Sequence, residues 1–166
     1  MGILRKFSLE NRIAVITGSG RGLGFEIAKA FAEAGAHVWL TGRNAQTLEE
    51  AADTLRNAGG KADYAAFDIA DTAAGSALVR RIMDEFGHLD ILVNNVGARD
   101  RRPLAEFSDD DVLELIRTDL TSSVSLSRDA AQAMNANGYG RIITITSILG
   151  HIVRPGDAIY PSPSRA

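Results

Sequence analysis

The sequence contains no cysteine among its 166 residues, which excludes disulfide bonds, thiolate metal sites and a cysteine nucleophile. It has no apolar run that approaches the roughly 18 residues needed to cross a bilayer. Residues 1–6 lack the apolar region of a signal peptide, and Lys6 occupies the position that a myristoylation motif gives to Ser or Thr. We therefore expect a soluble, cytoplasmic protein with no membrane partner.

The sequence also has only a small excess of one charge over the other. The 18 Lys and Arg residues nearly balance the 21 Asp and Glu residues, for a formal net charge of -3. This mild acidic balance gives no support for a nucleic-acid or membrane-surface partner. The three histidines, His37, His88 and His151, lack the spacing of metal ligands, so we assign no metal. The length corresponds to a single domain over residues 1–166, at about 150 residues per domain.

What the sequence does contain is an alternation of short apolar runs and helical patterns. This order predicts an α/β fold, a Rossmann-like doubly wound parallel sheet with helices on both faces. The expected strands cover residues 12–17, 37–41, 64–67, 89–94 and 141–146. Helices are expected from Gly22 to Ala34, from Asn44 to Gly59, from Asp71 to Phe86, and, bent or straight, from Ser108 to about Asn137.

A glycine cluster stands between the first strand and the first helix. Four glycines occur in the seven residues 18–24, whereas a turn that merely requires positive φ would explain one or two. Since a strand precedes them and a helix follows, their backbone N–H groups can approach a pyrophosphate at the positive end of that helix. The pattern predicts a nucleotide-binding loop that includes Gly18, Ser19, Arg21, Gly22, Leu23 and Gly24.

The strict G-x-G-x-x-G spacing is absent because Leu23 occupies the place of the third glycine, and the segment instead has the form T-G-x-x-x-G-x-G. At this point the chain resembles the short-chain dehydrogenase/reductase family. Four further motifs follow in the order and spacing of that family: Asp68-Ile69, Asn94-Asn95-Val96-Gly97, Ser147, and Tyr160 thirteen residues later.

The resemblance implies an NAD(P)(H)-dependent oxidoreductase that interconverts an alcohol and a carbonyl by hydride transfer. It further implies that Asp68 and Ile69 contact adenine. In the same way, Asn94, Val96 and Gly97 would shape the cofactor pocket.

The end of the second strand favours NADP(H) over NAD(H). A ribose-binding acid is expected about 20 residues after the glycines, yet residues 40–44 contain none. Arg43 and Arg21 could instead bind a 2′-phosphate, because a guanidinium can form two hydrogen bonds with one. The alternative is that Arg43 is only a solvated loop residue. The missing acid also weakens the interpretation as an S-adenosylmethionine-binding, methyltransferase-like domain.

The resemblance assigns catalysis to a Tyr, a Ser that orients the substrate, a Lys one helical turn after the Tyr, and an Asn after the fourth strand. Ser147 and Tyr160 match this set, whereas Asp119 stands at the Asn position and Ser164 at the Lys position. A Tyr that titrates near 10 needs a cation to act at neutral pH. Arg165 lies about 100° further around a helix and does not release its proton. We therefore expect the chain as written to be inactive or nearly so.

Family members continue beyond this length, so we expect a truncated or frameshifted product whose sheet ends after its fifth strand and exposes residues 141–146 as an apolar edge. Full-length relatives are expected to be homo-oligomers. A non-catalytic NADP(H)-binding pseudoenzyme or sensor is the alternative function. A purely structural Rossmann-like domain is the least favoured one.

The sequence constrains the substrate only to a small-molecule alcohol or ketone. Residues 7–9 and 154–157 resemble the gluconate 5-dehydrogenase-type branch of the family most, and 3-oxoacyl thioester reductases come next. The run of Arg99, Arg101 and Arg102 either meets an acidic substrate or forms a solvated loop.

Overall fold

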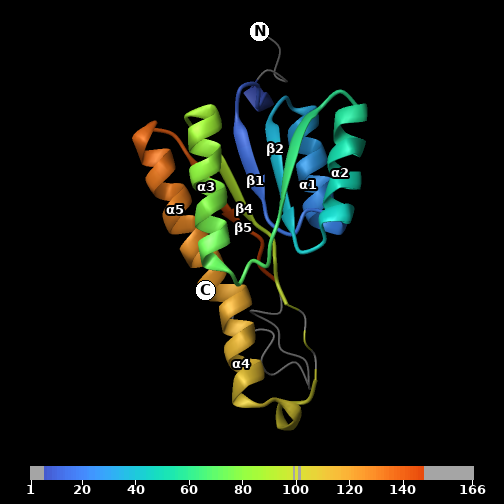
Figure 1. Cartoon of the computed structure of the whole chain (residues 1–166), viewed down its shortest axis with the longest axis vertical. Coiled ribbons are helices and arrows are strands. Elements are labelled where there is room, and N and C mark those ends of the chain that lie inside the picture. Colours follow the sequence, from blue (N-terminus) through green and yellow to red (C-terminus); the bar gives the residue numbers. More distant parts are fainter. Residues whose placement is uncertain (1–5, 99, 101, 148–166) are drawn as a thin grey trace.

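The computed structural model describes residues 6–98, 100 and 102–147, and strands and helices alternate along it (Figure 1). The strands are β1 (Ile13–Ile16), β2 (His37–Gly42), β3 (Lys61–Ala66), β4 (Ile91–Asn94) and β5 (Arg141–Thr144). The α-helices are α1 (Gly22–Glu33), α2 (Ala45–Asn57), α3 (Thr72–Phe86), α4 (Asp109–Ile116) and α5 (Ser122–Ala136). A 3₁₀ turn, η2 (Leu104–Glu106), precedes α4, and a π-helix, η3 (Arg117–Thr121), joins α4 to α5.

The five strands form one parallel sheet in the order β3-β2-β1-β4-β5. The chain runs outward from β1 to β3, then crosses to the other side of β1 and continues through β4 to β5. This reversal makes the fold a doubly wound α/β sheet, and the predicted fold class is confirmed. Ligands bind such sheets beside the reversal, at the carboxyl ends of the strands.

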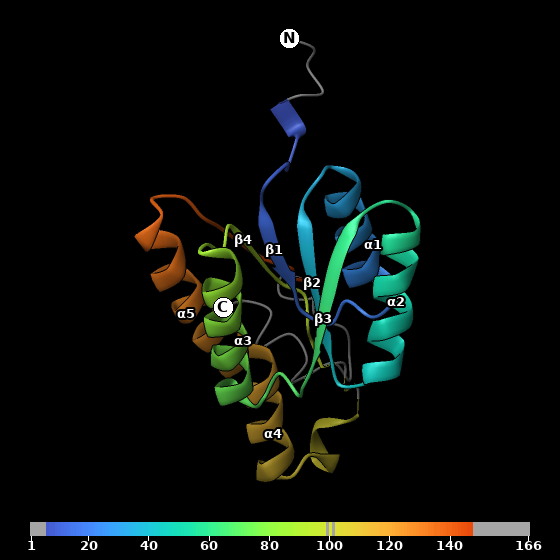
Figure 2. The ribbon, with the colours of Figure 1, turned by 45° about the horizontal axis from the view of Figure 1, so that its top comes forward.

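Helices cover both faces of the sheet (Figures 1 and 2). On one face, α1 and α2 pack over a core that includes Ala14 and Ile16 of β1. On the other, α3 and α5 pack over a core that includes Ile13 and Val15 of the same strand. Because alternate side chains of β1 enter two cores, the whole strand is apolar, as the sequence predicts for a strand buried on both faces.

Side-chain caps fix the starts of three helices where the sequence predicts them. The Asn44 carboxamide oxygen accepts the Thr47 N–H at 2.9 Å. The Asp71 carboxylate accepts the Ala74 N–H at 3.0 Å. At α4, Ser108 and Asp111 form a reciprocal capping box.

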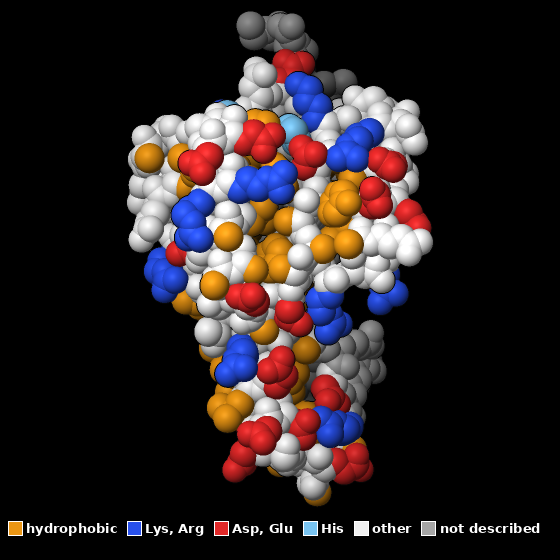
Figure 3. Space-filling view, viewed as in Figure 1, with side chains coloured by type: hydrophobic (Ala, Val, Ile, Leu, Met, Phe, Trp, Pro, Cys, Tyr) orange, Lys and Arg blue, Asp and Glu red, His pale blue; other side chains and the backbone are white. Residues whose placement is uncertain are grey.

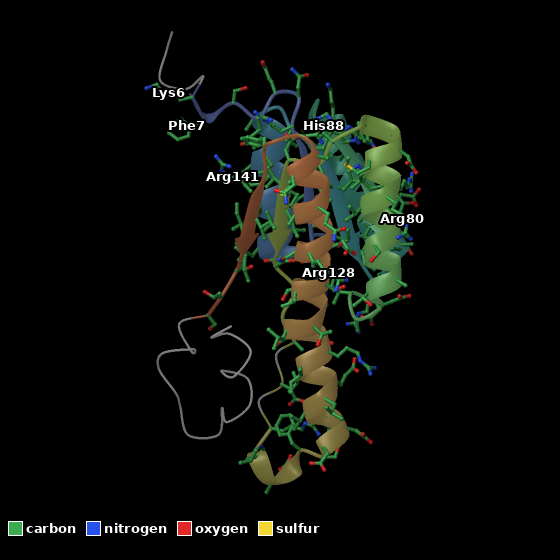
Figure 4. All side chains as sticks on the ribbon, turned by 90° about the vertical axis from the view of Figure 1, so that its left-hand side faces the viewer. Lys6, Phe7, Arg80, His88, Arg128 and Arg141 are labelled. Carbon is green, nitrogen blue, oxygen red and sulfur yellow. The ribbon has the colours of Figure 1, made fainter. Side chains whose placement is uncertain are left out.

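The strands predicted over residues 89–94 and 141–146 are each two residues shorter in the structure, and two other predicted elements differ more. β3 begins at Lys61, three residues before the predicted start at residue 64. Lys61 and Asp63 pair in register with β2, but their polar side chains at the sheet edge conceal the strand from a search for apolar runs. The helical region after Ser108 is interrupted by η3, and Figure 4 shows α4 extending below the sheet in continuation of α5.

β5 lies at an open edge of the sheet and pairs only with β4 among the described strands. All four of its residues are exposed, and Ile142 and Ile143 remain 41% and 42% accessible. Arg141, labelled in Figure 4, lies at the start of this edge. The apolar edge expected from the sequence is therefore present. Within the described ranges, each helix is too short or too polar to span a bilayer.

Candidate functional site

A cleft of about 1020 Å³ opens at the carboxyl ends of the strands, beside the point where the strand order reverses. Its walls come from the loops after the first four strands, the first residues of α2, and the segment from α4 to η3. Figure 3 shows basic and acidic side chains interspersed over the face in view. The lining residues are Gly18, Gly20, Arg21, Gly22, Thr41, Gly42, Arg43, Asn44, Thr47, Leu48, Phe67, Asp68, Ile69, Asn95, Val96, Gly97, Ala98, Glu114 and Thr118.

The glycine loop brings the amino terminus of α1 to the floor of the cleft. Gly18 has a φ of +63°, in the left-handed region that favours glycine. A Cβ atom at Gly24 would lie 2.5 Å from the Gly18 carbonyl oxygen and 2.6 Å from the side-chain Nδ2 of Asn95. Only glycine at position 24 therefore allows the helix to approach the two loops this closely.

The first turn of α1 has no side-chain cap and contains no acidic residue, in contrast to the capped starts of α2, α3 and α4. Its first N–H groups consequently have no side-chain acceptor among the described residues. Arg21 and Gly22, at this end of the helix, line the cleft. Free N–H groups together with the positive end of the helix dipole make an anion-binding site suited to phosphate.

Thr17 and Asn95 join the loops on either side of the reversal. The buried Thr17 hydroxyl accepts N–H groups from Asn95 at 2.9 Å and from Val96 at 3.1 Å. The Asn95 carboxamide donates to the carbonyl oxygens of Thr17 at 3.0 Å and Gly18 at 3.3 Å. These four bonds fix the glycine loop against the loop after β4. The site prediction omitted both residues, although a threonine at the end of a buried strand is a usable signal.

The structure brings eight of the predicted cofactor-binding residues together in the cleft wall. Four others lie outside that wall. Ser19 is fully buried, and its hydroxyl donates to the Ile16 carbonyl at 2.7 Å and accepts the Thr41 N–H at 3.0 Å. The residues in the wall are Gly18, Arg21, Gly22, Arg43, Asp68, Ile69, Val96 and Gly97, and the others are Ser19, Leu23, Gly24 and Asn94.

The other three have identifiable surroundings. Leu23 is 59% exposed on α1. Gly24 is buried at the close approach described above. The buried Asn94 donates from its carboxamide to the Ser127 hydroxyl at 2.9 Å, which connects β4 to α5.

Two arginines stand on the wall formed by the glycine loop and the end of β2. Arg21 and Arg43 are exposed, and both line the cleft beside the start of α2. Gly20, which the site prediction omitted, lies here as well, because a Cβ atom on it would come within 3.3 Å of Thr47. Residues 40–44 carry no carboxylate, so this wall is basic rather than acidic.

Asp119 lies on η3, behind the opposite wall of the cleft. Its carboxylate accepts the backbone N–H of Ala98, in the loop after β4, at 2.6 Å. Burial raises the pKa of Asp119, and the hydrogen bond from Ala98 opposes that shift only in part.

Of the predicted catalytic pair, the structure describes one member. Ser147 follows β5 and is half-buried. Tyr160 lies outside the described residues, as do Ser164 and Arg165.

Arg102 is engaged with carboxylates of its own segment. It forms ion pairs with Asp100 at 2.7 Å and with Asp111 at 3.1 Å, and its guanidinium stacks over the Phe107 ring. Hydrogen bonds to those two carboxylates raise the pKa of Arg102. This favours the solvated-loop interpretation of Arg102 over contact with an acidic substrate. Arg99 and Arg101 lie outside the described residues.

Comparison with known proteins identifies the family of this chain. The model of the short chain dehydrogenase family matches residues 12–164. Gluconate 5-dehydrogenase of Gluconobacter oxydans is 38% identical over 160 residues, which cover 96% of this chain and 62% of that protein.

Solved structures show the same architecture. Gluconate 5-dehydrogenase from Burkholderia cenocepacia, in complex with NADP and tartrate, has a TM-score of 0.92 and 38% identity, and the match covers 99% of this chain and 65% of that one. A 3-oxoacyl (acyl-carrier-protein) reductase from Agrobacterium tumefaciens with NADP bound has a TM-score of 0.91 and 30% identity, with 99% and 64% covered. The chain thus spans somewhat less than two thirds of the length of these relatives. It belongs to the short-chain dehydrogenase family of NAD(P)-dependent oxidoreductases.

Proposed function

We propose that this chain is the NADP(H)-binding part of an oxidoreductase that interconverts a small-molecule alcohol and its carbonyl compound. The observation that carries the proposal is the pairing, in one cleft, of an uncapped helix start with a basic wall at the end of β2. The first feature suits a pyrophosphate and the second a 2′-phosphate.

The residues of the cleft fit a dinucleotide. The N–H groups at the start of α1 would hold the pyrophosphate, and Arg21 and Arg43 would hold the 2′-phosphate. Asp68 and Ile69, which follow β3, would contact the adenine. Val96 and Gly97, which follow β4, would border the nicotinamide half, because β4 lies on the opposite side of β1 from β2 and β3. When bound, the nicotinamide supplies the atom that donates or accepts the hydride.

The chemistry of the remaining groups is proposed from the family resemblance. Ser147 would orient the substrate oxygen by a hydrogen bond, and Tyr160 would exchange a proton with it. Ser164 stands where the resemblance places the lysine, and its hydroxyl carries no positive charge that could stabilise a tyrosine phenolate. We therefore propose that the chain binds NADP(H) but turns it over slowly.

The replacement of the lysine by Ser164 also supports a second candidate function, that of a non-catalytic NADP(H)-binding protein. Restoring the lysine distinguishes the two. If Ser164→Lys combined with Pro163→Ala produces turnover well above that of the unmodified chain, an oxidoreductase site is present. If both proteins bind NADPH and neither turns it over, the binding function stands alone.

The names of the relatives suggest which substrates to test. We propose a sugar acid such as gluconate first, and a 3-oxoacyl thioester as its competitor. The assay follows NADPH absorbance with each substrate class at equal protein concentration. Oxidation of NADPH by the thioester without activity on the sugar acid would reverse this order.

A further inference from the structure

Asn137 is an exposed asparagine at the carboxyl end of α5, and a glycine follows it. Gly138 has a φ of +65°, in the left-handed region. Of all the asparagines in the sequence, only Asn137 precedes a glycine. The turn from α5 to β5 lies at the amino ends of the strands, away from the cleft, where Figure 4 labels His88 and Arg141.

Asparagine is a thermolabile residue, because its side-chain amide can be lost without an enzyme. The backbone nitrogen of the next residue attacks the side-chain carbonyl carbon Cγ, a C–N bond forms, and ammonia leaves with the proton of that nitrogen. Water then opens the resulting succinimide ring. The products are aspartate and isoaspartate, and in isoaspartate the main chain runs through the side-chain carboxyl group. A following glycine favours the attack, because it has no Cβ atom beside the nitrogen and its backbone rotates freely.

The structure holds both reacting groups only weakly. The Gly138 N–H donates to the Asn135 carbonyl oxygen at 3.2 Å. The Asn137 carboxamide donates to the carbonyl oxygens of Gly87 at 3.3 Å and Ala133 at 3.4 Å. These distances lie at or beyond the long end of the usual range for N–H···O bonds. Since helix ends open with little free energy, a brief opening of this turn frees the nitrogen and the side chain together.

Other described asparagines lack this combination. Asn57 and Asn135 are also exposed near the ends of helices, but each precedes an alanine, whose Cβ atom hinders the attack. Asn94 is buried and donates to Ser127. Exposure, a following glycine and weak bonds therefore coincide at Asn137.

We propose that Asn137 is a site of spontaneous deamidation in the folded protein, and that the modification weakens the contact between the ends of α3 and α5. The Asn137 carboxamide is the donor that links α5 to Gly87, the residue that ends α3. A carboxylate cannot donate this bond, and it places a negative charge beside the carboxyl ends of two helices, where anions are unfavourable. Isoaspartate also lengthens the main chain shortly before Tyr139, whose ring centroid lies 3.9 Å from the Arg12 guanidinium.

The first experiment incubates the folded, unmodified chain at mildly alkaline pH and maps its peptides by mass spectrometry. Asn135 is the internal control, because it is exposed at the same helix end. We expect Asn137 to lose its amide at least about tenfold faster than Asn135, with both aspartate and isoaspartate as products. The rate should rise with pH, because the attack requires the deprotonated Gly138 nitrogen. Equal rates at the two asparagines, or loss at Asn137 only after the chain is unfolded in urea, would overturn the proposal.

Two substitutions test the structural consequence. Asn137→Asp reproduces the aspartate product, whereas Asn135→Asp adds the same charge to the same helix end and leaves the bond to Gly87 in place. We expect Asn137→Asp to lower the urea midpoint by about 0.5 M and Asn135→Asp to lower it less. Equal midpoints for Asn137→Asp and the unmodified chain would refute the claim that the modification weakens the contact between α3 and α5.

Discussion

Gly24, in the first turn of α1, is a position at which an added methyl group should disturb the fold, because backbone lies against it. Its Cβ atom would lie 2.5 Å from the Gly18 carbonyl oxygen and 2.6 Å from the side-chain Nδ2 of Asn95. Neither atom can move freely, because the Asn95 carboxamide donates to both Thr17 and Gly18. Overpacking usually costs about 1–3 kcal/mol, and contact with backbone belongs at the upper end, so we expect Gly24→Ala to destabilise the fold by about 3 kcal/mol.

Urea denaturation followed by tryptophan fluorescence would measure this change. Trp39 is the single tryptophan and is fully buried on β2, so its emission reports on unfolding of the sheet. With a slope of about 2 kcal/mol/M, the midpoint should fall by about 1.5 M. Gly97→Ala is the matched control, because its Cβ atom would meet nothing within 4 Å and its midpoint should not change. Equal midpoints for the two variants would refute the close approach of α1 to the two loops.

Three further predictions follow from the cleft and the sheet edge. Arg43→Ala should weaken NADPH binding about tenfold and leave NADH binding nearly unchanged, as measured by fluorescence titration, because the proposed partner of this guanidinium is the 2′-phosphate, which NADH lacks. Asp119→Asn should stabilise the fold at neutral pH, since burial raises the pKa of Asp119 and penalises its ionised form in the folded state. That gain should shrink as the pH falls through the raised pKa, where Asp119 also becomes neutral, and urea midpoints at about pH 7.5 and about pH 4 would check the sign. Ile143→Lys should slow aggregation several-fold in light scattering, because it places a charge on the exposed edge of β5.

The sequence predicts the alternation of strands and helices along the chain, and the helix starts, because these follow from local rules. Short continuous apolar runs identify β1 and β4, and single polar residues such as Asn44 and Asp71 mark where helices begin. The predicted start of β3 is wrong because local rules look for apolar residues, and Lys61 and Asp63 are polar. Their place in the sheet depends on pairing with β2.

The sequence predicts the parts of the site that the local backbone forms, such as the glycine loop. It predicts less well the contacts between residues that are far apart in the sequence. Ser19 resembles a loop residue open to a ligand, yet its hydroxyl bonds to Thr41, 22 residues away, and is fully buried. The resemblance identifies Asp119 as a site position, but its bond to Ala98 requires η3 and the loop after β4 to be adjacent. No pattern within either segment indicates that the two segments lie side by side.

The most direct test of the central claim is a comparison of NADPH and NADH affinity in the unmodified chain and in the Arg21→Ala, Arg43→Ala double variant. We predict that the unmodified chain binds NADPH at least about tenfold more tightly than NADH, and that the double variant loses this preference while keeping NADH affinity. Equal affinity for the two cofactors in the unmodified chain, or a preference that survives the loss of both arginines, would contradict the assignment of this wall of the cleft to the 2′-phosphate.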